Sequence, residues 1–298
     1  MTFLSLTKRN CKMFFKDKGI FFTSLITPLI LLVLYATFLA NVYRDSFTSV
    51  MPEGIALEES LVNGLVGGQL LSSLLAVCTV TVAFCANMLM VADKVSGAAN
   101  DFLVTPVKRS VLALSYYVAT AISTLIICFV ALGAGLIYLS SVGWYLSFGD
   151  VLALILDVFL LSMFGTALSS VINYFLTSQG QISAVGSIVS AGYGFICGAY
   201  MPISSFSEGL QKVISFLPGT YGTSLLRNHA IGGVFREMEA IGLPEIVIDS
   251  LRDSIDCNLY FFDHKVATPV MYLILAAALF VTLSAYILLH IFAKKKKG

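Results

Sequence analysis

The chain has 298 residues, of which 58% are hydrophobic and only 12% are charged, and its mean hydropathy is +0.90. A soluble domain carries about 25% charged residues, so this composition excludes a soluble globular protein and predicts one that crosses a membrane several times. The net charge of +1 is uninformative, because basic and acidic residues nearly balance in number. They lie instead in separate segments of the chain.

Residues 1–18 are predicted to form an amphipathic helix in the membrane interface. In FLSLTKRNCKMFFKD, residues 3–17, most apolar side chains share one arc, and Arg9, Lys12 and Lys16 take the opposite arc. Such a helix places its cations beside anionic lipid headgroups. The alternative is a basic segment that only sets the orientation of the first span.

Long apolar windows without charges predict an all-α polytopic membrane protein, with residues 19–298 as its membrane domain. A crossing helix needs about 20 apolar residues, and the sequence offers six such windows. The first is longer than the apolar core of a cleaved signal peptide, so we expect it to be retained. The expected spans are 19–42, 64–91, 112–140, 150–173, 181–201 and 268–292.

Charged residues alternate between the two sides of this plan. Basic residues precede the first span, separate the second from the third, and follow the last, whereas the opposite connections are rich in Asp and Glu. The positive-inside rule then places both termini in the cytoplasm.

The cytoplasmic connection 92–111 is too long for a tight turn. Asn100 or Asp101 can cap a short helix there, and apolar residues on one side of it favour a helix that lies along the inner face and is presented to a partner. A loop that only obeys the positive-inside rule remains equally compatible. The apolar side and basic end of the segment are Leu103, Val104, Val107, Lys108 and Arg109.

The stretch 202–232 interrupts the apolar pattern at the outer end of the fifth span. SSFSEGLQKVISFL predicts a short amphipathic helix, and TYGTSLLRNHAIGG begins a second short one, with Arg227 and Asn228 at the external surface. Free backbone at membrane depth is costly unless it is helical or packed in protein, so we expect a re-entrant pair that dips into the outer leaflet without crossing. A plain external loop is the alternative. Residues 233–266 then form an acidic external cap.

Catalytic and metal-binding motifs are missing: GxxxxGK[ST], HExxH, GxSxG and CxxC do not occur, so no catalytic or metal site is predicted. Asp157 is the only full charge away from the ends of a predicted span. We expect it to face an external vestibule or a partner subunit, or else to snorkel or to be protonated. Gln69, Asn87 and Asn173 favour interhelical hydrogen bonds, although Asn87 and Asp157 are also candidates for a substrate path.

Two stretches resemble a known family. DKVSGAANDFLVTPVKRSVLALSYYVA, residues 93–119, is similar to the connection between the second and third spans of ABC-2 type permeases, the transmembrane subunits of ATP-binding-cassette exporters. ICGAYMPISSFSEGLQKVISFLPGTYGTSLLR, residues 196–227, resembles the end of their fifth span and their re-entrant helices. SGAAN at 96–100 departs from the charged run that the family usually has there, which bears on which ATPase is accepted. The matching residues are Gly97, Leu103, Thr105, Pro106 and Val107 in the first stretch and Gly198, Pro202, Leu217, Pro218, Tyr221 and Arg227 in the second.

The resemblance implies an export permease in a bacterial plasma membrane. It would assemble as two permease units, identical or homologous, with two copies of a separate ATPase that binds ATP and Mg; this chain would hold no cofactor and no nucleic acid. Segment 92–111 would be the coupling helix, and 202–232 an external gate. The cargo would be amphipathic: a drug, a lipid-like molecule or a toxin peptide. The implied coupling residues are Gly97, Asp101, Leu103, Thr105, Pro106, Val107 and Arg109, and the implied gate residues are Gly198, Pro202, Leu217, Pro218, Tyr221 and Arg227.

Two functions of other classes stay open at this point. One is a membrane-bound immunity or binding protein without transport, which would hold a ligand through 233–266. The other is an ion-coupled secondary carrier that depends on Asp157, because intramembrane carboxylates often mark ion pathways.

Overall fold

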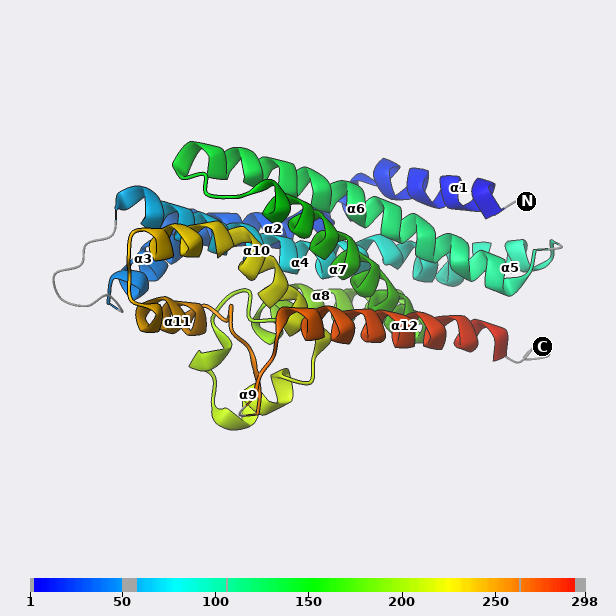
Figure 1. Ribbon diagram of the computed structural model, residues 1–298. Coiled ribbons are helices and arrows are strands. Elements are labelled where there is room, and N and C mark those ends of the chain that lie inside the picture. The colour runs from blue at the N-terminus through cyan, green and yellow to red at the C-terminus, as the bar shows by residue number, and fades with distance from the viewer. Residues whose placement is uncertain (1–2, 50–57, 106, 263, 293–298) are drawn as a thin grey trace.

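The computed structural model describes residues 3–49, 58–105, 107–262 and 264–292, and within them the protein is a bundle of long helices with one small hairpin (Figure 1). The elements are α1 (Phe3–Lys16), α2 (Lys18–Leu34), the π-helical turn η1 (Tyr35–Leu39), α3 (Ala40–Ser49), α4 (Glu59–Val95), α5 (Ala98–Leu103), α6 (Arg109–Val142), α7 (Phe148–Phe175), α8 (Gln179–Ile196), the 3-10 turn η2 (Ile203–Ser205), α9 (Glu208–Ile214), α10 (Pro218–Ala240), α11 (Glu245–Ser254), β1 (Tyr260–Phe261), β2 (His264–Lys265) and α12 (Thr268–Phe292).

Five helical runs of the described residues are long and apolar enough to cross a membrane. They confirm five of the expected spans, with shifted ends. The expected span 181–201 is shorter than predicted, because α8 has 18 residues, which rise about 27 Å, and ends at Ile196. The sixth crossing therefore remains a prediction. The five runs are Lys18–Asp45, Glu59–Val95, Arg109–Val142, Phe148–Phe175 and Thr268–Phe292.

Helix α4 is the axis of the bundle, and α2, α6, α7, α8 and α10 pack around it. It is apolar on all sides and almost wholly buried, as expected for a central helix. Glycines let neighbouring backbones approach it closely. A Cβ atom at Gly68 would lie 2.9 Å from the carbonyl oxygen of Ala230, and one at Gly165 of α7 would lie 2.6 Å from that of Thr79. These contacts fix how deep α7 and α10 sit against α4.

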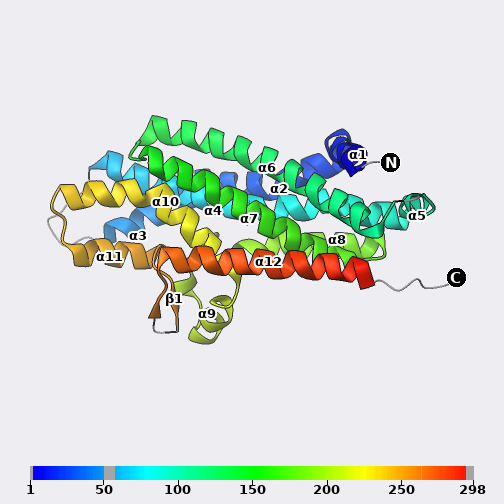
Figure 2. The ribbon, with the colours of Figure 1, turned by 45° about the vertical axis from the view of Figure 1, so that its right-hand side comes forward.

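The two described ends of the chain lie at the same end of the bundle as α5, which we call the inner end (Figure 1). Helices α3 and α11 lie at the opposite, outer end. Turning the molecule by 45° shows α1 nearly end-on beside α6, while the long helices still run across the view (Figure 2). Helix α1 therefore does not run parallel to the bundle, in keeping with a helix that lies in the interface.

The buried face of α1 differs from the predicted arc. Leu6, Asn10 and Phe14 face the bundle, whereas Leu4 is exposed. Placing Arg9 among the lipid-facing cations was wrong, because its guanidinium turns inward to a carboxylate of α4. The exposed lysines of α1 keep the predicted orientation.

The outer segment also differs from the predicted pair of short helices. Helix α9 is short, as expected, but α10 has 23 residues and rises about 34 Å, so it is as long as a span, although it is not among the five apolar runs. It packs along α4, α7 and α12. The acidic cap expected from residue 233 thus begins inside α10, and α11 with the hairpin forms the rest of it.

Candidate functional site

The short helix α5 lies at the extreme inner end of the bundle (Figure 1). Gly97 begins it with φ +85°, a left-handed conformation that favours glycine. The predicted caps at Asn100 and Asp101 were wrong, since both residues lie inside the helix. Val104 follows the helix and is 87% exposed. The side chain of Leu103 and all of Pro106 lie outside the described residues.

The other residues predicted to couple to an ATPase hold the end of α5 in place. The hydroxyl of Thr105 donates to the carbonyl oxygen of Phe102 at 2.6 Å. Phe102 and Val107 pack against an apolar cluster at the inner end of the bundle, and Arg109 begins α6. The segment therefore has one side anchored to the bundle and one side exposed.

Arg9 of α1 joins three further helices at this end. Its Nη2 lies 3.0 Å from Oδ1 of Asp93 in α4, and its Nη1 contacts the other carboxylate oxygen. Tyr116 of α6 donates its hydroxyl to Asp93 at 2.5 Å, and the guanidinium lies 5.3 Å from the ring centre of Phe102 in α5. Two-pronged pairs of this kind are among the stronger polar contacts in proteins. These contacts connect α1, α4, α5 and α6 at the inner end of the bundle.

Sequence reasoning missed the role of Asp93. Its signal was a single carboxylate at the inner end of the second span, where a charge needs a partner. The partner could not be read from the sequence, because Arg9 lies 84 residues away.

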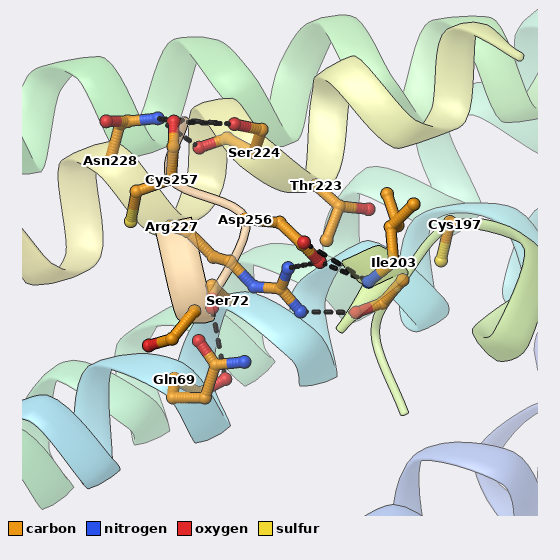
Figure 3. Close-up of polar contacts among 12 residues, drawn as sticks. Gln69, Ser72, Cys197, Ile203, Thr223, Ser224, Arg227, Asn228, Asp256 and Cys257 are labelled. Atoms are coloured by element: carbon orange, nitrogen blue, oxygen red, sulfur yellow. Dashed lines mark hydrogen bonds and ion pairs between the residues drawn. The ribbon is translucent and has the colours of Figure 1, made fainter. Parts of the chain in front are cut away.

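A second polar cluster surrounds Arg227 of α10, which is fully buried and paired with Asp256 (Figure 3). Placing it at the external surface was wrong. Its Nη1 lies 2.9 Å from Oδ2 of Asp256, and its Nη2 donates to the carbonyl oxygen of Gly198. The same carboxylate accepts the backbone N–H of Ile203, with N–O distances of 2.9 and 3.1 Å. One ion pair thus joins α10, the end of α8, η2 and the connection after α11.

Backbone geometry shapes this cluster. Gly198 has φ +75° and Asp256 has φ +54°, so the chain turns sharply at both places. A Cβ atom at Gly198 would lie 3.0 Å from the side chain of Ile203, which leaves little room for another residue. Burial raises the pKa of the Asp256 carboxyl, and the guanidinium of Arg227 opposes this shift. Arginine keeps its proton in proteins, and the carboxylate accepts from its guanidinium and from the N–H of Ile203, so the pair is ionic.

The other predicted gate residues lie around this cluster. Pro202 precedes η2, Leu217 precedes α10, and Pro218 is the first residue of α10. Tyr221 donates its hydroxyl to the carbonyl oxygen of Ser215 at 2.5 Å and so ties α10 to the end of α9. The structure thus brings the second family-like stretch together at one place.

Gln69 of α4 lies across from this cluster (Figure 3). Neither its amide atoms nor Nε of Arg227 has a hydrogen-bond partner among the described residues, so the interhelical bond expected of Gln69 is not found. The corresponding prediction for Asn87 is confirmed: its Nδ2 donates to the hydroxyls of Ser169 and Ser170 in α7, at 3.2 and 2.9 Å.

Asp157 of α7 is fully buried, so the expectation that it faces a vestibule or snorkels does not hold. Its Oδ2 lies 2.6 Å from Nδ1 of His229 in α10, and its Oδ1 accepts the hydroxyl of Tyr272 in α12 at 2.6 Å. Further outward, Asp150 pairs with Arg236 between the same two helices, α7 and α10. Polar contacts therefore fasten α10 to α7 at two levels.

Among the described residues there is no group of three or more His, Cys, Asp or Glu that could hold a metal ion. The six cysteines are free thiols, and five of them are buried, where cysteine packs as a small apolar residue.

The model of a family described as ABC-2 family transporter protein matches residues 47–286, which include α5, the Arg227 cluster and Asp157. The chain belongs to the ABC-2 transporter family. A comparison with curated proteins finds no match. As an ABC-2 family protein, the chain is a membrane subunit of a transporter and is not itself catalytic.

Proposed function

We propose that this ABC-2 family protein is the permease subunit of an exporter that is driven by ATP. A separate subunit, present in two copies, would bind ATP with Mg and hydrolyse it, and a second permease, identical or homologous, would complete the complex. The cargo would be amphipathic. Both termini and α5 would face the cytoplasm of a bacterial cell, because the basic residues gather at that end.

The observation that carries the proposal is the contact of α5 with Arg9. Helix α5 offers an exposed surface at the inner end, and the Arg9–Asp93–Tyr116 contacts connect it to α1, α4 and α6. A force that an ATPase applies to α5 would therefore displace packed helices as rigid bodies. We assign this transmission of force to the segment 92–111, the proposed coupling segment.

The Arg227 cluster supports the assignment of 202–232 as the outer gate. It closes the space between α8 and α10 with a buried ion pair and two backbone contacts. If α8 and α10 moved apart, water would reach both Arg227 and Asp256. The pair could then separate, because each charge would be solvated. Such a gate would be closed in the resting protein and would open when the helices of the bundle move.

Val104→Asp tests the proposal, because Val104 is 87% exposed and the change should leave the fold intact. We expect wild-type thermal stability, loss of the P-loop ATPase that copurifies from native membranes, and loss of ATP-driven export in proteoliposomes. Ile246→Asp is the matched control, since Ile246 is 76% exposed on α11 at the outer end. Export by Val104→Asp equal to that of the control would overturn the coupling role of α5.

The alternative of a binding protein without transport needs a variant that leaves the fold intact. Deleting 236–262 would remove Asp256 and leave Arg227 buried without its partner, so the fold itself would suffer. Changing the exposed carboxylates Glu237 and Glu245 to glutamine avoids this. A binding protein should then lose its ligand, whereas the exporter should keep ATP-driven export.

A further inference from the structure

A small pocket of about 260 Å³ lies at the inner end, between α5 and the ends of α4, α6, α7 and α12. It shares no residue with the Arg227 cluster. Its polar lining consists of Lys94, Asn100, Arg109, Tyr116, Tyr174 and His290.

The lining carries positive charge and no carboxylate. Lys94, Arg109 and His290 come from three different helices, so the fold rather than local sequence brings them together. Asp93 is the neighbour of Lys94 in the chain, but Arg9 and Tyr116 already bind its carboxylate. A phosphate in this pocket would lie beside the cations of Lys94 and Arg109, to which it is attracted.

Lys94 and His290, which are both half-buried, are held in place by their neighbours. Nζ of Lys94 donates to the carbonyl oxygens of Asn173 and Tyr174, at 3.2 and 2.8 Å, and lies 5.2 Å from the ring centre of Tyr174. An ammonium group has three donors, so one remains for a ligand. His290 packs edge-on against the rings of Tyr174 and Tyr286, and its buried Nε2 has no partner among the described residues.

We propose that this pocket binds a phosphate anion, either the phosphate of an anionic lipid headgroup or free phosphate. Arginine and lysine are the side chains that proteins use most for this group. The volume is below the 300–1,000 Å³ or so of sites for drug-sized ligands, so it suits one phosphate group and not a nucleotide. The pocket lies at the inner ends of four long helices, where lipid headgroups are found.

The bound phosphate has a structural consequence. Asn100 of α5 and His290 of α12 both line the pocket, so one anion would contact the proposed coupling segment and the last helix at once. Binding would hold α5 in the position seen here. The site itself does not depend on the exporter assignment, because anion binding can be measured on the chain alone.

The test is a titration of the purified full-length chain in neutral detergent with short-chain phosphatidylglycerol and, separately, with inorganic phosphate. Binding is followed by calorimetry and by the shift in melting temperature. We expect saturable binding by the wild type, and at least tenfold weaker binding by Arg109→Gln and by His290→Gln. Lys108→Gln is the matched control: it removes the same charge from the exposed neighbouring position outside the pocket, and its affinity should stay within about twofold.

The two probes identify the source of the phosphate. Binding of phosphatidylglycerol that inorganic phosphate does not displace assigns the pocket to a lipid headgroup, and displacement assigns it to free phosphate; both support the site. No saturable binding of either probe would overturn it. Equal weakening by Lys108→Gln and Arg109→Gln would also overturn it, because diffuse surface charge would then explain the binding.

Discussion

Arg227 and Asp256 form an ion pair from which solvent is almost excluded, with side-chain exposures of 1% and 5% and an N–O distance of 2.9 Å. The arginine belongs to α10 and the aspartate to the connection after α11. A buried pair adds little net stability, but removing one partner leaves a charge without compensation. Its main effect here is to specify how α8, α10 and the outer cap fit together.

Asp256→Asn should therefore lower stability strongly, by about 3–5 kcal/mol, because Arg227 stays buried without a counter-charge. Denaturant unfolding in detergent measures the change. Arg252→Gln is the control: Arg252 pairs with Glu239 at 3.2 Å on the surface, and such pairs contribute about 0–1 kcal/mol. Equal losses for the two variants would show that the Arg227 pair is not required for the fold.

Arg9→Gln should detach α1 from the coupling end. The variant loses the ion pair with Asp93 and the contact with the Phe102 ring, so we expect faster hydrogen exchange in α1 and several-fold lower ATP-driven export. Lys8→Gln, at an exposed position of the same helix, should leave both quantities unchanged. Unchanged export by Arg9→Gln would contradict a role of Arg9 in the proposed coupling of α5 to the bundle.

Asp157→Asn separates the exporter from an ion-coupled carrier. Asparagine can still accept from Tyr272 but no longer pairs with His229, so we expect a stability loss of about 1–3 kcal/mol and persistent, ATP-dependent export in proteoliposomes. A carrier that depends on this carboxylate would lose all transport and would respond to a proton or sodium gradient. Tyr272→Phe, which removes one hydrogen bond, should cost about 0.5–1.5 kcal/mol.

Gly233→Ala should be poorly tolerated although it adds one methyl group. The new Cβ atom would lie 1.9 Å from the carbonyl oxygen of Tyr145, so α10 would have to move away from its neighbours. A Cβ atom added at Gly232 would lie 3.5 Å from Nη1 of Arg236, at the end of a flexible side chain. Gly232→Ala should keep stability or raise it by up to about 1 kcal/mol, since alanine favours helix. Similar melting temperatures for the two variants would contradict the close packing of α10.

The sequence by itself determined the class of the protein, five of its membrane helices and the presence of a short helix in segment 92–111. Each of these depends on residues that are neighbours in the chain: a window of apolar residues, a helical period, or a break at glycine and proline. The family-like stretches are local in the same way, and the match over residues 47–286 confirms the family they indicated.

Only the tertiary structure decided how the charges inside the protein are compensated. Arg9 with Asp93, Asp157 with His229, and Arg227 with Asp256 are separated by 84, 72 and 29 residues along the chain. From the sequence, Arg227 was predicted at the external surface and Asp157 facing water, because an isolated charge is costly in a membrane. The fold instead buries both beside partners, and partners so distant in sequence meet only when α4, α7 and α10 pack together. Charge pairing across helices is a property of that packing, which no local pattern encodes.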